Sequence, residues 1–216
     1  MTSASTALWA ALADLYHQSW RLALLNTALS AVLAPLLLGA VWVPLLLVPA
    51  AVVAGPLLMA LMHCAVTLAQ TEDLTLRCAV TGLRLHWRRG VVLGLIGVLV
   101  SVPGIVGLAT YGRAGAWVLA AVVLYLLVAF AAYQLTVWPL AVAEQGAPLT
   151  SVLGSAARTA MRRPFQAVLL VLALALVNLV GAAAALMPLL TLTVAYSFLA
   201  AAHFALPASH FREASD

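Results

Sequence analysis

Long uninterrupted apolar runs make up most of this chain, and short polar stretches separate them. The first run covers residues 22–69, more than twice the roughly 20 residues that one transmembrane helix needs. Pro44 and Pro49 lie near its middle, and prolines there are typical of a tight turn between two helices. The pattern therefore predicts two helical spans, over residues 22–42 and 47–69.

The rest of the chain predicts four further spans. They cover residues 91–110, 116–140 and 165–186, and a last span ends near Leu206, with Pro188 in the hairpin before it. The apolar runs are continuous rather than alternating, so they favour helices over the strands of a membrane barrel. We predict a single all-α integral membrane domain over residues 1–216, a polytopic bundle of about six transmembrane helices.

The composition supports this prediction. Hydrophobic residues make up 66% of the chain and charged residues only 7%, whereas a soluble domain has roughly 45–50% apolar and about 25% charged residues. A water-soluble fold of this size would lack the polar residues to cover its exterior. The bilayer removes that requirement.

The arginines predict the orientation. All ten basic residues of the chain are arginines, and six spans place nine of them on one face and Arg113 alone on the other. Positive residues stay on the cytoplasmic side, so we expect both termini in the cytoplasm and a location in the bacterial inner membrane. This distribution fits topology and anionic phospholipid headgroups, and we expect no nucleic acid partner.

Two cytoplasmic stretches resemble each other. Segments 84–90 and 158–164 carry arginines in the same arrangement, and each leads directly into a span. Apolar residues recur at helical spacing over 76–87 and more weakly over 152–165, and segment 8–21 is a looser third copy. These patterns predict interfacial amphipathic helices and three repeated helix–hairpin units of about 70 residues. The alternative is that any helix entering a bilayer ends in arginines.

Three features together resemble the YesL-like family of bacterial integral membrane proteins, a domain of unknown function. They are the first span with Asn26 and its hairpin leading into 55–57, the aromatic and arginine segment 83–89, and segment 155–164 before two closing spans. Members often occur beside carbohydrate-uptake systems. The resemblance therefore implies an accessory role in sugar import and no assigned catalytic residues. The chain departs from the family in lacking lysine in its cytoplasmic segments.

Polar residues inside the spans are candidates for a site. No Asp, Glu or Lys falls within a predicted span core, which argues against proton- or sodium-coupled transport. Asn26, Gln134 and Asn178 fall one in each proposed unit, and Tyr196 lies in the last span. They would line a polar groove that accepts a sugar. The alternative is that they hydrogen-bond between helices and hold the bundle together.

Six arginines could form a basic cytoplasmic collar that contacts phospholipid headgroups or the acidic helix of a partner subunit. They are Arg84, Arg88, Arg89, Arg158, Arg162 and Arg163.

Histidines and cysteines give weaker indications. His63 and His203 lie at similar predicted depth and could ligate haem or a metal, although hydrogen bonds at the interface explain them more simply. The other histidines, among them His86, are expected in solvent. Cys64 and Cys78 show no metal or redox spacing and are expected as free thiols.

Motifs for nucleophilic, hydrolytic or phosphate chemistry are absent from the sequence, so we predict no catalytic residue, cofactor or metal site and no enzymatic activity. The leading expectation is a non-enzymatic accessory or scaffold subunit of a membrane complex such as a solute importer. The first alternative is a small-solute transporter or permease, and the second is a haem- or metal-binding membrane protein.

Overall fold

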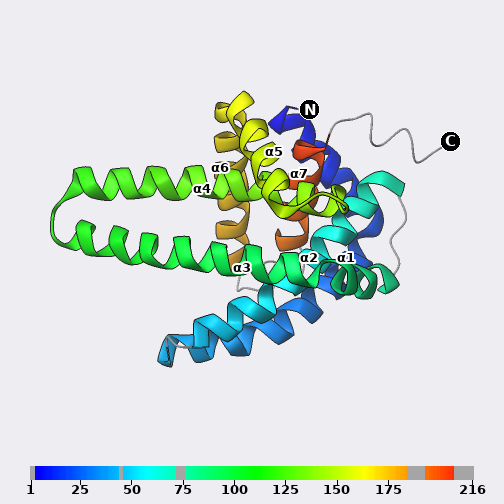
Figure 1. Cartoon of the computed structure of the whole chain (residues 1–216), viewed down its shortest axis with the longest axis horizontal. Helices are drawn as coiled ribbons and strands as arrows, with labels where there is room; N and C mark the ends of the chain where they lie inside the picture. The colour runs from blue at the N-terminus through cyan, green and yellow to red at the C-terminus, as the bar shows by residue number, and fades with distance from the viewer. Residues whose placement is uncertain (1–2, 44–45, 72–75, 184–192, 207–216) are drawn as a thin grey trace.

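The computed structural model describes residues 3–43, 46–71, 76–183 and 193–206, and within these ranges the regular structure is entirely helical. The all-α prediction is therefore confirmed. In chain order the helices are α1 (Ala4–Trp42), α2 (Leu47–Thr71), α3 (Leu76–Arg113), α4 (Trp117–Ala143), α5 (Leu149–Arg162), α6 (Pro164–Ala183) and α7 (Val194–Ala205) (Figure 1).

Two helices are longer than predicted. The N-terminal segment and the first span form the single helix α1, and the amphipathic stretch 76–89 continues without a break into the third span as α3. At 1.5 Å per residue the 38 residues of α3 extend about 57 Å, well beyond the roughly 30 Å of a hydrocarbon core. The arginine-rich first turns of α3 therefore reach past any membrane that its apolar part crosses.

Most of the amphipathic stretch predicted over 152–165 forms a separate helix, α5. The chain leaves helical geometry at Arg163, which ends α5 before α6 begins. Val152 and Ala156 form the buried face of α5, whereas Phe165, predicted on the same apolar face, is 89% exposed at the start of α6.

Four helical stretches are long and apolar enough to cross a membrane: Val48–Gln70, Arg77–Arg113, Trp117–Ala143 and Pro164–Gly181. Two shorter apolar stretches, Ala23–Val32 and Val194–Ala205, stand where the first and sixth spans are predicted. The predicted hairpin around Pro188 lies outside the described residues.

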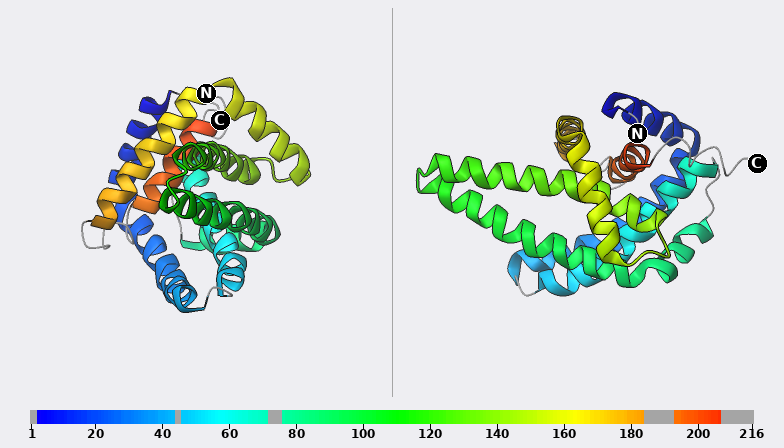
Figure 2. Two further views of the ribbon diagram at one scale, coloured as in Figure 1. Left: turned by 90° about the vertical axis from the view of Figure 1, so that its left-hand side faces the viewer. Right: turned by 45° about the horizontal axis from the view of Figure 1, so that its top comes forward.

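The helices form two crossing groups rather than one parallel bundle. The α3–α4 hairpin projects away from the other helices, and α6 and α7 run across its base (Figure 1). The left view of Figure 2 shows the same arrangement, since it looks along α3 and α4 while α6 and α7 run across the view. The hairpin of α1 and α2 packs beside the base of α3.

Glycines allow α2 and α3 to touch backbone to backbone. A Cβ atom on Gly90 would lie 2.7 Å from the Cα atom of Pro56, and one on Gly94 would lie 2.9 Å from the carbonyl oxygen of Ala51. Any side chain at these positions would force the helices apart. The close approach fixes an antiparallel register in which Gly55 lies opposite Gly90.

The short helix α7 is the centre of the packing. Most of its described side chains are buried, including Leu199 and Phe204. Three alanines of α1, Ala4, Ala7 and Ala11, recur at helical spacing on the face that packs against it. Small residues there let the two helices approach closely.

Candidate functional site

A cavity of about 540 Å³ lies where α2, α3, α4, α6 and α7 meet. Its volume is within the range of about 300–1,000 Å³ typical of small-molecule sites. Most of its wall is apolar and includes Leu58, Leu93, Leu127, Phe130, Trp138 and Leu174.

Glycines on two helices line this space, and one of them leaves it open. Gly55 of α2 and Gly94 and Gly97 of α3 all contribute to the wall. A Cβ atom on Gly97 would meet only the Nε2 atom of Gln134, at 3.7 Å, which is an ordinary van der Waals contact. The face of α3 at Gly97 therefore opens into the cavity. At Gly55 and Gly94 the backbone of the opposing helix already occupies the space that a side chain would take.

Four polar side chains reach the cavity wall: Ser101, Gln134, Asn178 and Ser197. Asn178 Nδ2 donates hydrogen bonds to Leu174 O at 2.7 Å and Ser197 Oγ at 2.9 Å. Within the described part of the chain, the Gln134 amide, the Ser101 hydroxyl and the Asn178 carbonyl oxygen have no hydrogen-bond partner. These three groups can therefore bind a ligand.

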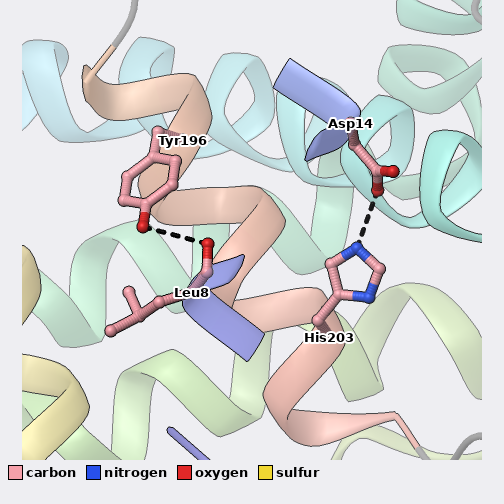
Figure 3. Close-up of polar contacts among 4 residues, drawn as sticks. All are labelled: Leu8, Asp14, Tyr196 and His203. Carbon is pink, nitrogen blue, oxygen red and sulfur yellow. Dashed lines mark hydrogen bonds and ion pairs between the residues drawn. The ribbon is translucent and has the colours of Figure 1, made fainter. Parts of the chain in front are cut away.

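The structure brings two of the four predicted groove residues together and places the other two elsewhere. Gln134 and Asn178 line the cavity, whereas Asn26 is fully buried on α1 and does not contribute to its wall. The Tyr196 hydroxyl turns the other way and donates to the carbonyl oxygen of Leu8 at 3.2 Å (Figure 3). Tyr196 thus joins α7 to α1.

The two histidines predicted at matched depth have different partners. His203 Nε2 lies 2.7 Å from Asp14 Oδ2, where α1 crosses α7 (Figure 3). His63 instead faces His86, with 5.4 Å between the ring centroids. Among the described residues, no three His, Cys, Asp or Glu side chains are placed to hold a metal ion.

The expectation that His86 is solvated is wrong, since this residue is only 3% exposed. The unbroken helix α3 turns His86 toward α2. Gly82, one turn earlier, lies directly against the side chain of His63 and lets the two helices close. The Nδ1 atom of His63 and the Nε2 atom of His86 are buried there without a hydrogen bond from the described residues.

Both cysteines are free thiols, as predicted. Cys78 Sγ donates to Thr67 Oγ1 at 3.5 Å, across the interface between α3 and α2.

One of the six predicted collar arginines has a different environment from the rest. The guanidinium of Arg89 donates four hydrogen bonds of 2.6–2.9 Å to main-chain carbonyl oxygens at the end of α4. Their acceptors are Ala141, Glu144, Gln145 and Ala147. Arg89 therefore joins α3 to the α4–α5 connection, a role that nothing in the local sequence indicated. The other five are exposed, as a lipid or partner contact requires: Arg84, Arg88, Arg158, Arg162 and Arg163.

Comparison of the chain with models of protein families, with curated proteins and with solved structures finds no match. The resemblance to the YesL-like family stays a prediction.

Proposed function

We propose that this chain is an integral membrane protein that binds a small molecule inside its helical domain and acts as a small-solute transporter or permease. The observation that carries the proposal is the cavity of about 540 Å³, at which Gln134 and Asn178 converge with hydrogen-bonding groups left open. A side-chain amide in an apolar environment is costly unless it is hydrogen-bonded. A bound solute would satisfy that requirement.

The proposal places the chain in the bacterial inner membrane with six spans and both termini in the cytoplasm. The four long apolar helices and the two shorter apolar stretches supply six segments. The orientation in the membrane is proposed from the arginines, because nine of them would lie on one side and Arg113 alone on the other. The starts of α1 and α3, and the whole of α5, would lie at the cytoplasmic surface with their arginines near the lipid headgroups.

The wall of the cavity argues against a sugar as the solute. A carbohydrate presents many hydroxyl groups, and each one buried without a partner would be costly. In the described part of the chain, the lining offers the polar side chains of Ser101, Gln134, Asn178 and Ser197 besides the Trp138 indole, and Ser197 already bonds to Asn178 and to Thr193 O. A link to carbohydrate uptake would therefore have to operate through a partner protein.

The cavity can be tested without knowing the solute. The Gly97→Leu substitution places a large side chain into the open space, whereas Gly107→Leu on the same helix changes a position whose Cβ atom would meet only Tyr111, outside the cavity. Small molecules that co-purify with each protein in lipid nanodiscs would be extracted and compared by mass spectrometry. We expect a species that wild type and Gly107→Leu retain and Gly97→Leu loses. Identical extracts from all three proteins would contradict the proposal.

A second candidate function is a non-enzymatic accessory subunit of a membrane complex. The projecting ends of α3 and α4 favour it, because they expose apolar side chains beyond the reach of the other helices (Figure 1). These include Ile105, Val106, Trp117 and Val118. A pull-down of the tagged protein from its host in gentle detergent would recover stoichiometric importer subunits if this candidate is correct. Recovery of the protein alone would leave the transporter proposal.

A further inference from the structure

The chemistry of the cavity narrows its ligand to one class. Among the described residues that line it, none is an Asp, Glu, Lys, Arg or His. An ion placed there would lose its hydration shell without gaining a counter-charge, which is far more costly than burying a neutral polar group. The ligand is therefore uncharged.

The distribution of polar atoms divides the ligand into two parts. Gln134 lies opposite Gly97, and Ser101 stands one helical turn further along α3 on the same wall. Both residues present their open hydrogen-bonding groups to the same cavity, and the leucines, valines and Phe130 that line it offer only apolar contact. A matching ligand has an apolar body and one compact polar group that forms hydrogen bonds, such as a hydroxyl, a carbonyl or an amide.

The surroundings of the cavity indicate where the ligand comes from. Ala175 on the cavity wall is exposed, and the neighbouring outward positions of α6, Leu172, Leu176 and Leu179, are exposed leucines. The cavity therefore opens between apolar surfaces. Gly97 follows Arg89 by eight residues, or about 12 Å of helix, so the opening would lie within the hydrocarbon layer of a membrane whose cytoplasmic face is marked by the arginines.

From these observations we infer that the cavity binds a neutral amphiphile dissolved in the bilayer, which enters sideways between α3, α4 and α6 and whose polar group is held by Gln134 and Ser101. This inference rests on the proposed function, because it names the class of molecule that the same cavity takes.

The test uses the full chain in lipid nanodiscs and a long-chain alcohol with a photoreactive diazirine in its tail. Cross-linked peptides identify the labelled helices. Competition with n-decanol, n-decane and decyl sulfate compares a neutral amphiphile, a hydrocarbon and an anion of equal chain length. We expect labels on α3, α4 and α6, and competition by decanol at concentrations about 10-fold lower than for decane, since one or two hydrogen bonds separate the two. Decyl sulfate should compete no better than decane, because it would bury a charge without a counter-charge.

Matched variants connect the selectivity to named side chains. Gln134→Leu keeps the size of the side chain and removes its amide, so it should weaken competition by decanol about 2- to 10-fold and leave decane unchanged. Gln145→Leu makes the same substitution at an exposed position in the α4–α5 connection and should match wild type. Equal competition by decyl sulfate, or an unchanged preference for decanol in Gln134→Leu, would overturn the inference.

The same experiment separates this inference from the proposed function. If Gly97→Leu abolishes labelling and Gly107→Leu does not, the cavity binds small molecules, and a lack of preference for decanol then rejects only the ligand class. If Gly97→Leu is labelled like Gly107→Leu, the cavity does not hold the probe and the inference fails, whereas the proposed function is still decided by the species that co-purify with the wild type and Gly107→Leu but not with Gly97→Leu.

Discussion

The side chain of Arg89 binds carbonyl groups at the carboxyl end of α4, where the last turn of a helix leaves such groups without a helical partner. It donates from a neighbouring helix to Ala141 O in the last turn of α4 and to three carbonyl oxygens beyond the helix, those of Glu144, Gln145 and Ala147. A planar guanidinium with five N–H donors suits this task, and a lysine ammonium could not reach all four oxygens. Arg89 thereby couples the positions of α3, α4 and α5.

We predict that Arg89→Ala lowers the free energy of unfolding by about 3 kcal/mol. The substitution removes hydrogen bonds from a charged donor and leaves partly buried carbonyl oxygens without a partner, and losses of this size are typical of such hydrogen bonds. Unfolding in mixed detergent micelles would measure it. Arg88→Ala is the matched control, because Arg88 is exposed and lies over the Trp87 ring, and it should change stability by less than about 0.5 kcal/mol. Similar losses in both variants would contradict the role assigned to Arg89.

The contact between Asp14 and His203 is the second residue-level link, and it fastens α1 where it crosses α7 (Figure 3). Both side chains are largely shielded, with 27% and 13% of their surfaces exposed. A double-mutant cycle with Asp14→Ala and His203→Ala should give a coupling free energy of roughly 0.5–3 kcal/mol. Asp14→Ala combined with Arg113→Ala at the tip of the α3–α4 hairpin should be additive. Additivity in both cycles would show that the contact does not stabilise the crossing.

At the scale of elements, the interface of α2 and α3 depends on glycine. Gly90→Ala would place its Cβ atom 2.7 Å from a backbone atom of Pro56, which has no freedom to rotate away. We expect a loss of stability of about 1–3 kcal/mol from overpacking. Gly154→Ala is the control, since a Cβ atom on this α5 residue meets nothing within 4 Å. That substitution should be neutral or stabilise by up to about 1 kcal/mol.

At the scale of the whole molecule, the proposed topology places the two ends of α4 on opposite sides of the membrane. In a protein with both native cysteines replaced by alanine, Arg113→Cys and Gln145→Cys introduce thiols at exposed positions beyond each end. A membrane-impermeant maleimide should label Arg113→Cys in intact cells and Gln145→Cys only after permeabilisation. Ser5→Cys should behave like Gln145→Cys if all four predicted spans between them cross the membrane, and labelling of Ser5→Cys from outside would instead require an odd number of spans between these two residues.

The sequence determined the class of the fold and much of its segmentation. Apolar runs of sufficient length allow only helices in a bilayer, because every backbone group must then be bonded within its own segment. The turn after Trp42, the short connection around Gly115 and the separate helix α5 follow from prolines, glycines and amphipathic spacing that are local in the chain. The polarity of Gln134 and Asn178 within apolar spans also marked them as candidates before any contact was known.

Tertiary packing decided what each of these residues does. Gln134 and Asn178 share a cavity because α4 and α6 meet there, while Tyr196 faces α1 because α7 presents its other side. His86 is buried because Gly82 and Gly90 bring α3 against α2, and Arg89 is engaged because α4 ends beside it. Periodicity identifies the face of a helix that is apolar, but close packing between distant segments selects the neighbours of that face. The helices could therefore be located from local chemistry alone, and the site required the contacts among them.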